Sequence, residues 1–350
     1  MSAYYEPWAI GESGAKAPTT NLGRLGGVGK LRQNMDVGVR DRMRGCAVGA
    51  AVGDALGMPL EFGPRQPADR LVREMRPGRV PSGSFTDDTE MALAVAESLV
   101  AHYPLDADDL AQRFLAWYRT GPADVGIHTG SVLERIDGGQ GWQAAARAAQ
   151  RGIPDAAGNG SVMRCWPVAL AHWDDTIGLL ADSRLQSRVT HAHADCEAGC
   201  AFVNAVIYFL LHGAGTAEAV AHAVQVTGDG MAAEFRQVIE AAAGRNREDL
   251  KNSGWVRHTV ESAMWGLLTT GSFEEAVVQV VNLGDDTDTA GTVVGALAGA
   301  AYGLEAIPVR WREAVRGEWP LRSGKMWRAA DLIALADRLG ACSLPPAEER

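Results

Sequence analysis

Two short motifs combine threonine and aspartate directly before segments with helical spacing. Ser84–Thr89 reads Ser-Phe-Thr-Asp-Asp-Thr, and Gly284–Thr289 reads Gly-Asp-Asp-Thr-Asp-Thr. Thr and Asp at a helix start accept hydrogen bonds from free N–H groups, so helix capping explains each motif taken alone. The two together indicate further chemistry, because adjacent carboxylates carry more negative charge than a cap needs and repel one another.

A divalent cation bound between the carboxylates would relieve this repulsion. Carboxylate and hydroxyl oxygens are hard ligands, which suit Mg²⁺ or Mn²⁺ better than Zn²⁺. If the two motifs converge in the fold, they would share two metal ions about 4 Å apart. The sequence therefore predicts a dinuclear Mg²⁺ or Mn²⁺ site.

Two other polar segments lie at predicted helix boundaries. Gly53–Gly57 ends the first long helix and leads to Glu61. Gly158–Arg164 places Asn159 and several backbone amides before a short helix. Such a turn can present N–H groups to phosphate or ribose oxygens, although glycine turns are common.

Histidines and cysteines near residue 190 superficially resemble a zinc site. Thr190–His193 contains two histidines, and Cys196 and Cys200 follow. These cysteines are four residues apart on an apolar helix, where small cysteines usually pack in the core. Core packing is therefore the favoured interpretation, with zinc as the alternative.

From residue 40 onward, apolar residues recur at helical spacing, and alternating β-branched runs are nearly absent. No fixed repeat or βαβ rhythm appears, so we predict one all-α domain over residues 39–343, followed by a polar tail at 344–350. The expected helices are Arg40–Ala55, Glu90–His102, Ala107–Arg119, Trp142–Arg151, Ala194–His212, Thr216–Val226, Met231–Ala243, Trp255–Thr269, Ser272–Asn282, Thr289–Gly303 and Ala329–Leu339.

Composition narrows the class of protein. The 350 residues are 47% hydrophobic and 22% charged, which is typical of a globular chain. The net charge of −10 argues against binding to nucleic acid or to anionic membranes. Five scattered cysteines and no signal-peptide pattern predict a reducing, cytoplasmic location. The uncharged stretch Ala198–Ala217 is better explained as a buried core helix than as a membrane span.

Residues 1–38 differ from the rest of the chain. They hold seven glycines and little apolar periodicity, but include Tyr4, Tyr5 and Trp8. Two interpretations stay open: a disordered leader, or a flexible arm whose aromatic side chains anchor onto a partner or onto the chain's own domain.

Taken in order, these motifs resemble the ADP-ribosylglycohydrolase family, whose members remove ADP-ribose from modified proteins. The resemblance covers nearly all of residues 40–310. It includes Asp124-Val125-Gly126 and the Gly/Ala-rich helix after Thr289, besides the motifs already described. It implies an all-α orthogonal helical bundle with two Mg²⁺ or Mn²⁺ ions in a central cleft.

The resemblance also implies roles for individual residues. Asp124 matches an acidic position near the scissile bond, which favours arginine-linked ADP-ribose. Asp285 departs from the pattern, since the family usually has glycine there; this carboxylate would either tighten the metal site or point to solvent. The implied metal ligands are Thr86, Asp87, Asp88, Asp286, Asp288 and Thr289; the catalytic residues are Asp124, Asp87 and Asp288; and the ADP-ribose contacts are Glu61, Asn159, Gly160, Ser161 and His191.

The implied reaction is hydrolysis of the N-glycosidic bond between the distal ribose and an arginine guanidinium of a protein. Metal ions would grip the ribose hydroxyls and lower the pKa of a bound water. Surrounding carboxylates would stabilise an oxocarbenium-like transition state, with Asp124 as general acid/base or assisting ring opening.

Three other readings of the function remain. One is an immunity protein whose N-terminal arm neutralises an ADP-ribosyltransferase toxin, with or without hydrolysis. Another is a family member without activity, against which the intact ligand set argues. The third is a hydrolase for serine-linked ADP-ribose or for small ADP-ribosylated molecules.

Overall fold

The computed structural model describes residues 35–342, which form a helical fold with one small hairpin. The short antiparallel strands are β1 (Arg316–Glu318) and β2 (Met326–Arg328). The helices are α2 (Val37–Gly57), α3 (Asp87–Ala101), α4 (Ala107–Arg119), α5 (Ile127–Asp137), α6 (Trp142–Gly152), α7 (Trp166–Ala171), α8 (Thr176–Arg188), α9 (Ala194–Leu211), α10 (Thr216–Thr227), α11 (Ala233–Ala241), α12 (Val256–Thr269), α13 (Phe273–Val281), α14 (Thr287–Tyr302), α15 (Val309–Ala314) and α16 (Ala329–Gly340).

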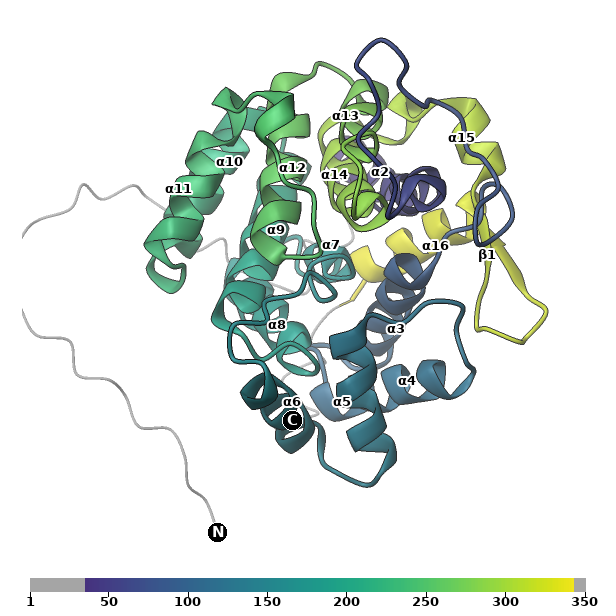
Figure 1. Cartoon of the computed structure of the whole chain (residues 1–350), viewed down its shortest axis with the longest axis vertical. Coiled ribbons are helices and arrows are strands. Elements are labelled where there is room, and N and C mark those ends of the chain that lie inside the picture. The colour runs from purple at the N-terminus through teal and green to yellow at the C-terminus, as the bar shows by residue number, and fades with distance from the viewer. Residues whose placement is uncertain (1–34, 343–350) are drawn as a thin grey trace, which may run out of the picture.

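Helices α2 and α14 pack side by side in the centre of the molecule (Figure 1). Glycines spaced four residues apart line one face of each helix, because every fourth residue lies on the same side. A Cβ atom added to Gly49 would lie 2.3 Å from the Gly295 carbonyl oxygen, and one added to Gly53 would lie 1.9 Å from that of Gly291. The two backbones therefore touch directly, which only glycine permits.

The helix prediction is confirmed in class but differs in detail. Helix α2 begins at Val37, three residues before the predicted start, while α5 and α8 were not predicted as helices. Helix α3 begins at Asp87 and α14 at Thr287, so much of each Thr/Asp motif lies inside the first helical turn rather than before it. The predicted arm lies mostly outside the described residues, as does the polar tail, and both stay predictions.

Helix α9 contains most of the long uncharged stretch Ala198–Ala217, which continues into the start of α10. By length and composition alone it is the one helix among residues 35–342 that passes a test for a membrane span, and 78% of its apolar window is buried inside the fold. Its side chains pack against α8, α10 and α14. The expected core helix is therefore what the structure has at this position.

The glycine contact gives a stability prediction. Gly49→Ala should lower the free energy of unfolding by about 1–3 kcal/mol, because its methyl group would overlap backbone atoms of α14 that cannot move aside. Gly152→Ala is the control, since nothing lies within 4 Å of its added Cβ. Urea denaturation would measure both variants, and equal stability for the two would contradict the close contact.

Candidate metal and nucleotide cleft

One cleft of about 410 Å³ collects most of the predicted site residues. Its acidic end lies where α14 begins, next to the turn that follows α2 and the first turn of α3. The predicted residues that line it are Glu61, Asp87, Asp88, Asp124, Asn159, Gly160, His191, Asp286, Asp288 and Thr289. The two Thr/Asp motifs therefore converge, although two hundred residues separate them.

Thr86 and Ser161 are the two predicted site residues that do not line this cleft. The Thr86 hydroxyl donates to Asp54 at 2.8 Å, directly beside the acidic end. Ser161 is fully buried, and its hydroxyl accepts a hydrogen bond from Ser187 at 2.9 Å. The side chain of Ser161 therefore bonds to α8 through Ser187 and does not line the cleft.

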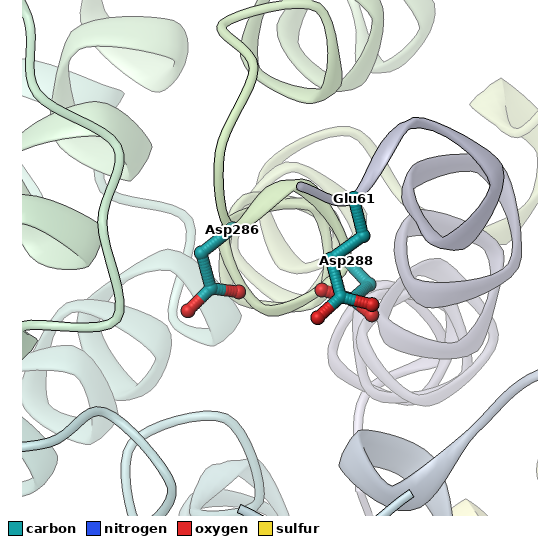
Figure 2. Close-up of side chains that lie close together, drawn as sticks. All are labelled: Glu61, Asp286 and Asp288. Carbon is teal, nitrogen blue, oxygen red and sulfur yellow. The ribbon is translucent and has the colours of Figure 1, made fainter. Parts of the chain in front are cut away.

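Three carboxylates come closest to forming a metal site. Glu61, Asp286 and Asp288 each offer an oxygen, and these oxygens lie within 4.8 Å of one another (Figure 2). Glu61 was predicted to contact ADP-ribose, and its position here also makes it a candidate metal ligand. In the described residues, this acidic group is the one cluster that could hold a metal, and the histidines and cysteines near residue 190 form none.

The N-terminal turn of α3 adds two more buried carboxylates. The Oδ1 atom of Asp88 is buried and accepts no hydrogen bond from any residue that the structure describes. Such an atom is costly without a partner, and a hard cation would supply one. The donor set around it, carboxylates with a few hydroxyls, fits Mg²⁺ or Mn²⁺ on chemical grounds.

Burial and mutual repulsion perturb these acids strongly. Burial, followed by repulsion from neighbouring carboxylates, holds the pKa of Asp87, Asp88 and Asp288 well above the usual range. Burial also raises the pKa of Asp286, although a hydrogen bond from Asn159 Nδ2 at 2.8 Å counteracts part of the shift. Such strained acids are typical of a functional site.

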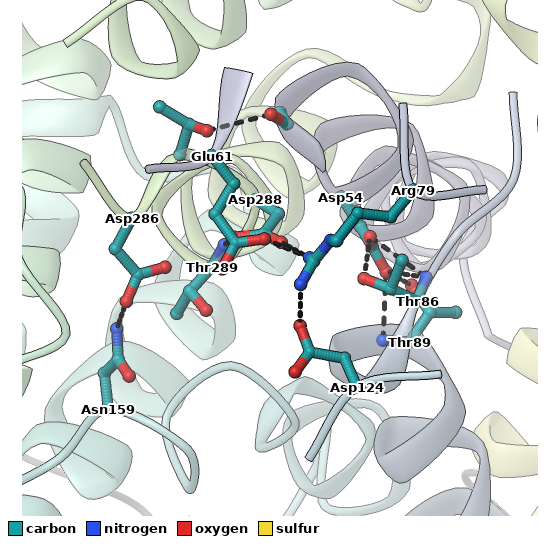
Figure 3. A network of polar contacts seen from close by, with 12 residues as sticks. Asp54, Glu61, Arg79, Thr86, Thr89, Asp124, Asn159, Asp286, Asp288 and Thr289 are labelled. Carbon is teal, nitrogen blue, oxygen red and sulfur yellow. Dashed lines mark hydrogen bonds and ion pairs between the residues drawn. The ribbon is translucent and has the colours of Figure 1, made fainter. Parts of the chain in front are cut away.

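Helix capping accounts for little of the side-chain bonding in these motifs, where Asp288 Oδ1 accepts one first-turn hydrogen bond, from the Thr289 N–H at 2.9 Å. Thr86 and Asp286 occupy the N-cap positions of α3 and α14, yet neither side chain accepts a capping hydrogen bond. The cap of α3 comes from α2 instead: fully buried Asp54 accepts hydrogen bonds from the backbone N–H and hydroxyl groups of Thr86 and Thr89 (Figure 3). Because Thr86 gives its proton to Asp54, its oxygen keeps lone pairs for a cation.

Arg79 is a site residue that sequence analysis missed. Its guanidinium donates to both Glu61 and Asp124, and Nη2 lies 3.5 Å from Asp288 Oδ2 (Figure 3). It comes from the irregular segment between α2 and α3, which carries no periodicity or motif that could have indicated it. Asp54 did have a signal, as a carboxylate between small residues in the segment Gly53–Gly57.

Asp285 does not belong to the acidic cluster. Its side chain is exposed, and its backbone adopts a left-handed φ of 61°. Its carbonyl accepts from Phe62 N at 2.7 Å, and its N–H donates to Gly63 O at 3.0 Å. This residue therefore shapes the turn, and its carboxylate points to solvent.

Comparison with known proteins agrees with this architecture. Residues 35–346 match the model of the ADP-ribosylglycohydrolase family. The chain belongs to this family. A solved structure described as an ADP-ribosylglycohydrolase-related protein complex superposes with a TM-score of 0.70 at 32% identity, covering 87% of this chain and 99% of that one.

Two relatives within the family have named activities. An ADP-ribosylarginine hydrolase of Serratia proteamaculans is 33% identical over 286 residues, covering 77% of this chain and 74% of that protein. An ADP-ribosyl-dinitrogen reductase glycohydrolase of Rhodospirillum rubrum is 33% identical over 285 residues, covering 78% and 90%. The chain is accordingly an ADP-ribosylglycohydrolase-type hydrolase with an all-α fold.

The buried carboxylates give a metal-binding prediction. Mg²⁺ or Mn²⁺ at about 100 times its dissociation constant should raise the melting temperature of the wild-type protein by about 5 °C, since the cation binds the folded state. Asp288→Asn should lose most of this rise because it removes a buried ligand charge. Asp285→Asn is the matched control, and an equal loss in both variants would contradict the assignment.

The raised pKa values give a pH prediction in chelator. A carboxyl group with a raised pKa binds more protons when folded, so its contribution to the free energy of unfolding is present at low pH and lost as pH rises above about 4. In EDTA at pH 8, Asp288→Asn should therefore melt above the wild type, by about 3 °C. The gap should narrow toward pH 5; a gap that widens in acid would refute the repulsion.

Proposed function

We propose that the chain is a metal-dependent hydrolase that releases ADP-ribose from arginine side chains of modified proteins. The cleft itself supports this choice of acceptor, because a guanidinium already fits between Glu61 and Asp124. That group belongs to Arg79, whose side chain is 39% exposed at the mouth of the cleft. A guanidinium is planar and donates hydrogen bonds in a fixed geometry, which two facing carboxylates match. An ADP-ribosylated arginine side chain needs this arrangement.

The names of the two relatives support the same acceptor. One is an ADP-ribosylarginine hydrolase and the other an ADP-ribosyl-dinitrogen reductase glycohydrolase, and both are 33% identical to this chain. Their matched segments cover more than three quarters of this chain. Identity at this level supports the reaction class, and the guanidinium position in the cleft supports the linkage.

The two acidic motifs would hold two Mg²⁺ or Mn²⁺ ions. The proposed ligands are Thr86, Asp87, Asp88, Asp286, Asp288 and Thr289, with Glu61 beside them. Bound metal would supply Lewis acidity and a water of lowered pKa next to the ribose. Asn159 would keep the Asp286 carboxylate turned toward the cleft, as its 2.8 Å hydrogen bond does here.

Asp124 is the proposed proton-transfer residue. Its carboxylate lines the cleft, is 29% exposed, and bonds a guanidinium nitrogen of Arg79. With substrate bound, the guanidinium of the acceptor would take the place of Arg79, and Asp124 would exchange a proton at the leaving nitrogen or assist opening of the ribose. The buried carboxylates nearby would stabilise positive charge that develops at the anomeric carbon.

The decisive experiment is incubation with arginine-ADP-ribosylated protein and Mg²⁺ or Mn²⁺. We expect release of ADP-ribose, with Asp124→Asn lowering kcat about 100-fold or more while metal binding persists. Asp155→Asn, an exposed aspartate outside the cleft, is the control and should keep full turnover. Release from serine-linked but not arginine-linked substrate would overturn the acceptor, and no release from either would overturn the hydrolase.

A further inference from the structure

Arg164 is a buried arginine that follows the glycine loop of the cleft, Gly158–Gly160. It has no acidic partner among the described residues. Arg164 is fully buried and packs over the Phe114 ring at 4.2 Å. Its guanidinium donates to the side-chain and backbone oxygens of Gln186, both at 3.2 Å, and to the Thr190 hydroxyl at 2.7 Å. Within residues 35–342 it makes no ion pair. A buried cation without an anion is costly, so its retention needs a reason.

The hydrogen-bond directions lead from Arg164 toward the cleft. A guanidinium can only donate, so the Thr190 hydroxyl is the acceptor in the bond between them. The hydroxyl still has its own proton, and His191 Nδ1 lies 2.8 Å from it. A buried hydroxyl proton without an acceptor is costly, so Thr190 donates to Nδ1.

This bond determines the tautomer of His191. Burial, followed by repulsion from His128 and Arg164, holds the pKa of His191 well below its usual value, so the ring is neutral. Because Nδ1 accepts, the single ring proton sits on Nε2. His191 lines the cleft, and its Nε2 lies 3.1 Å from where a Cβ on Gly160 would be. The Nε2–H group is therefore a donor beside the glycine loop.

The polarity of the cleft identifies the ligand that suits this donor. The loop Gly158–Gly160 supplies further donors, since the Gly160 N–H makes no hydrogen bond to the protein within the described residues. A buried cation and neutral N–H donors at the loop attract the negative charge of phosphates. A diphosphate is the part of an ADP-ribose group that matches this end.

We propose that Arg164 is a positioning residue which, through Thr190, holds His191 as an Nε2–H donor for the ligand's diphosphate. When the diphosphate binds, its negative charge lies three hydrogen bonds from the Arg164 guanidinium, through Thr190 and His191. This inference rests on the proposed function only in taking an ADP-ribose group as the ligand.

The test compares two substitutions of Thr190 by calorimetry in Mg²⁺. Thr190→Val keeps the shape but removes the hydroxyl, and should weaken ADP-ribose binding about tenfold, whereas adenosine, which has no phosphate, should change by less than about twofold. Thr190→Ser keeps the hydroxyl and should bind ADP-ribose within about twofold of wild type. Thermal melting confirms that each variant is folded.

A second readout reports the tautomer of His191 directly. Nitrogen-15 NMR of the wild-type protein should show His191 protonated on Nε2 at pH 7, and Thr190→Val should lose this preference. An Nδ1–H tautomer in the wild type would overturn the proposal. The proposal would also be overturned if the folded Thr190→Val variant bound ADP-ribose like the wild type. The same holds if the variant lost as much affinity for adenosine as for ADP-ribose. None of these readouts involves cleavage, so they stay independent of whether arginine-linked ADP-ribose is the substrate.

Discussion

The direct backbone contact between α2 and α14 is the constraint on which the site depends. Gly45, Gly49 and Gly53 face the carbonyls of Gly299, Gly295 and Gly291, so the antiparallel helices are held in one register. The end of α2 then meets the start of α14, where the Thr287 hydroxyl donates to the Gly57 carbonyl at 2.8 Å. This junction places Glu61 next to Asp286 and Asp288, and a larger residue in the glycine row would move them apart.

A cluster of buried acids is held together by neutral donors and one arginine. Thr86 and Thr89 donate hydrogen bonds to Asp54, and Asn159 donates one to Asp286. These bonds stabilise the ionised form of each acid without adding charge. Arg79 is the one cation of the described residues that reaches the cluster, and it spans the gap to Asp124. These carboxylates repel one another, and bound cations or the guanidinium of the proposed substrate would relieve that repulsion.

Sequence periodicity predicted the helices well where one face is apolar, as in α9, and poorly in α8, whose buried face holds Asp182, Ser183 and Gln186. The acidic motifs were visible because two motifs with adjacent carboxylates carry more negative charge than helix capping needs. Their convergence was not visible from local spacing, since it depends on glycine packing across two hundred residues. Arg79 was invisible for a similar reason: its partners are far along the chain, and nothing in its own segment marks it.

The cleft has two chemically opposite ends, and this polarity limits how an ADP-ribose group can lie in it. At one end the carboxylates of α3 and α14 favour cations and ribose hydroxyls. At the other, neutral His191 and the glycine loop lie above a buried guanidinium and favour anions. With the diphosphate at the glycine loop, as proposed, the distal ribose would reach the carboxylates and its anomeric carbon would face Asp124, so the polarity of the cleft favours the orientation that the proposed hydrolysis needs.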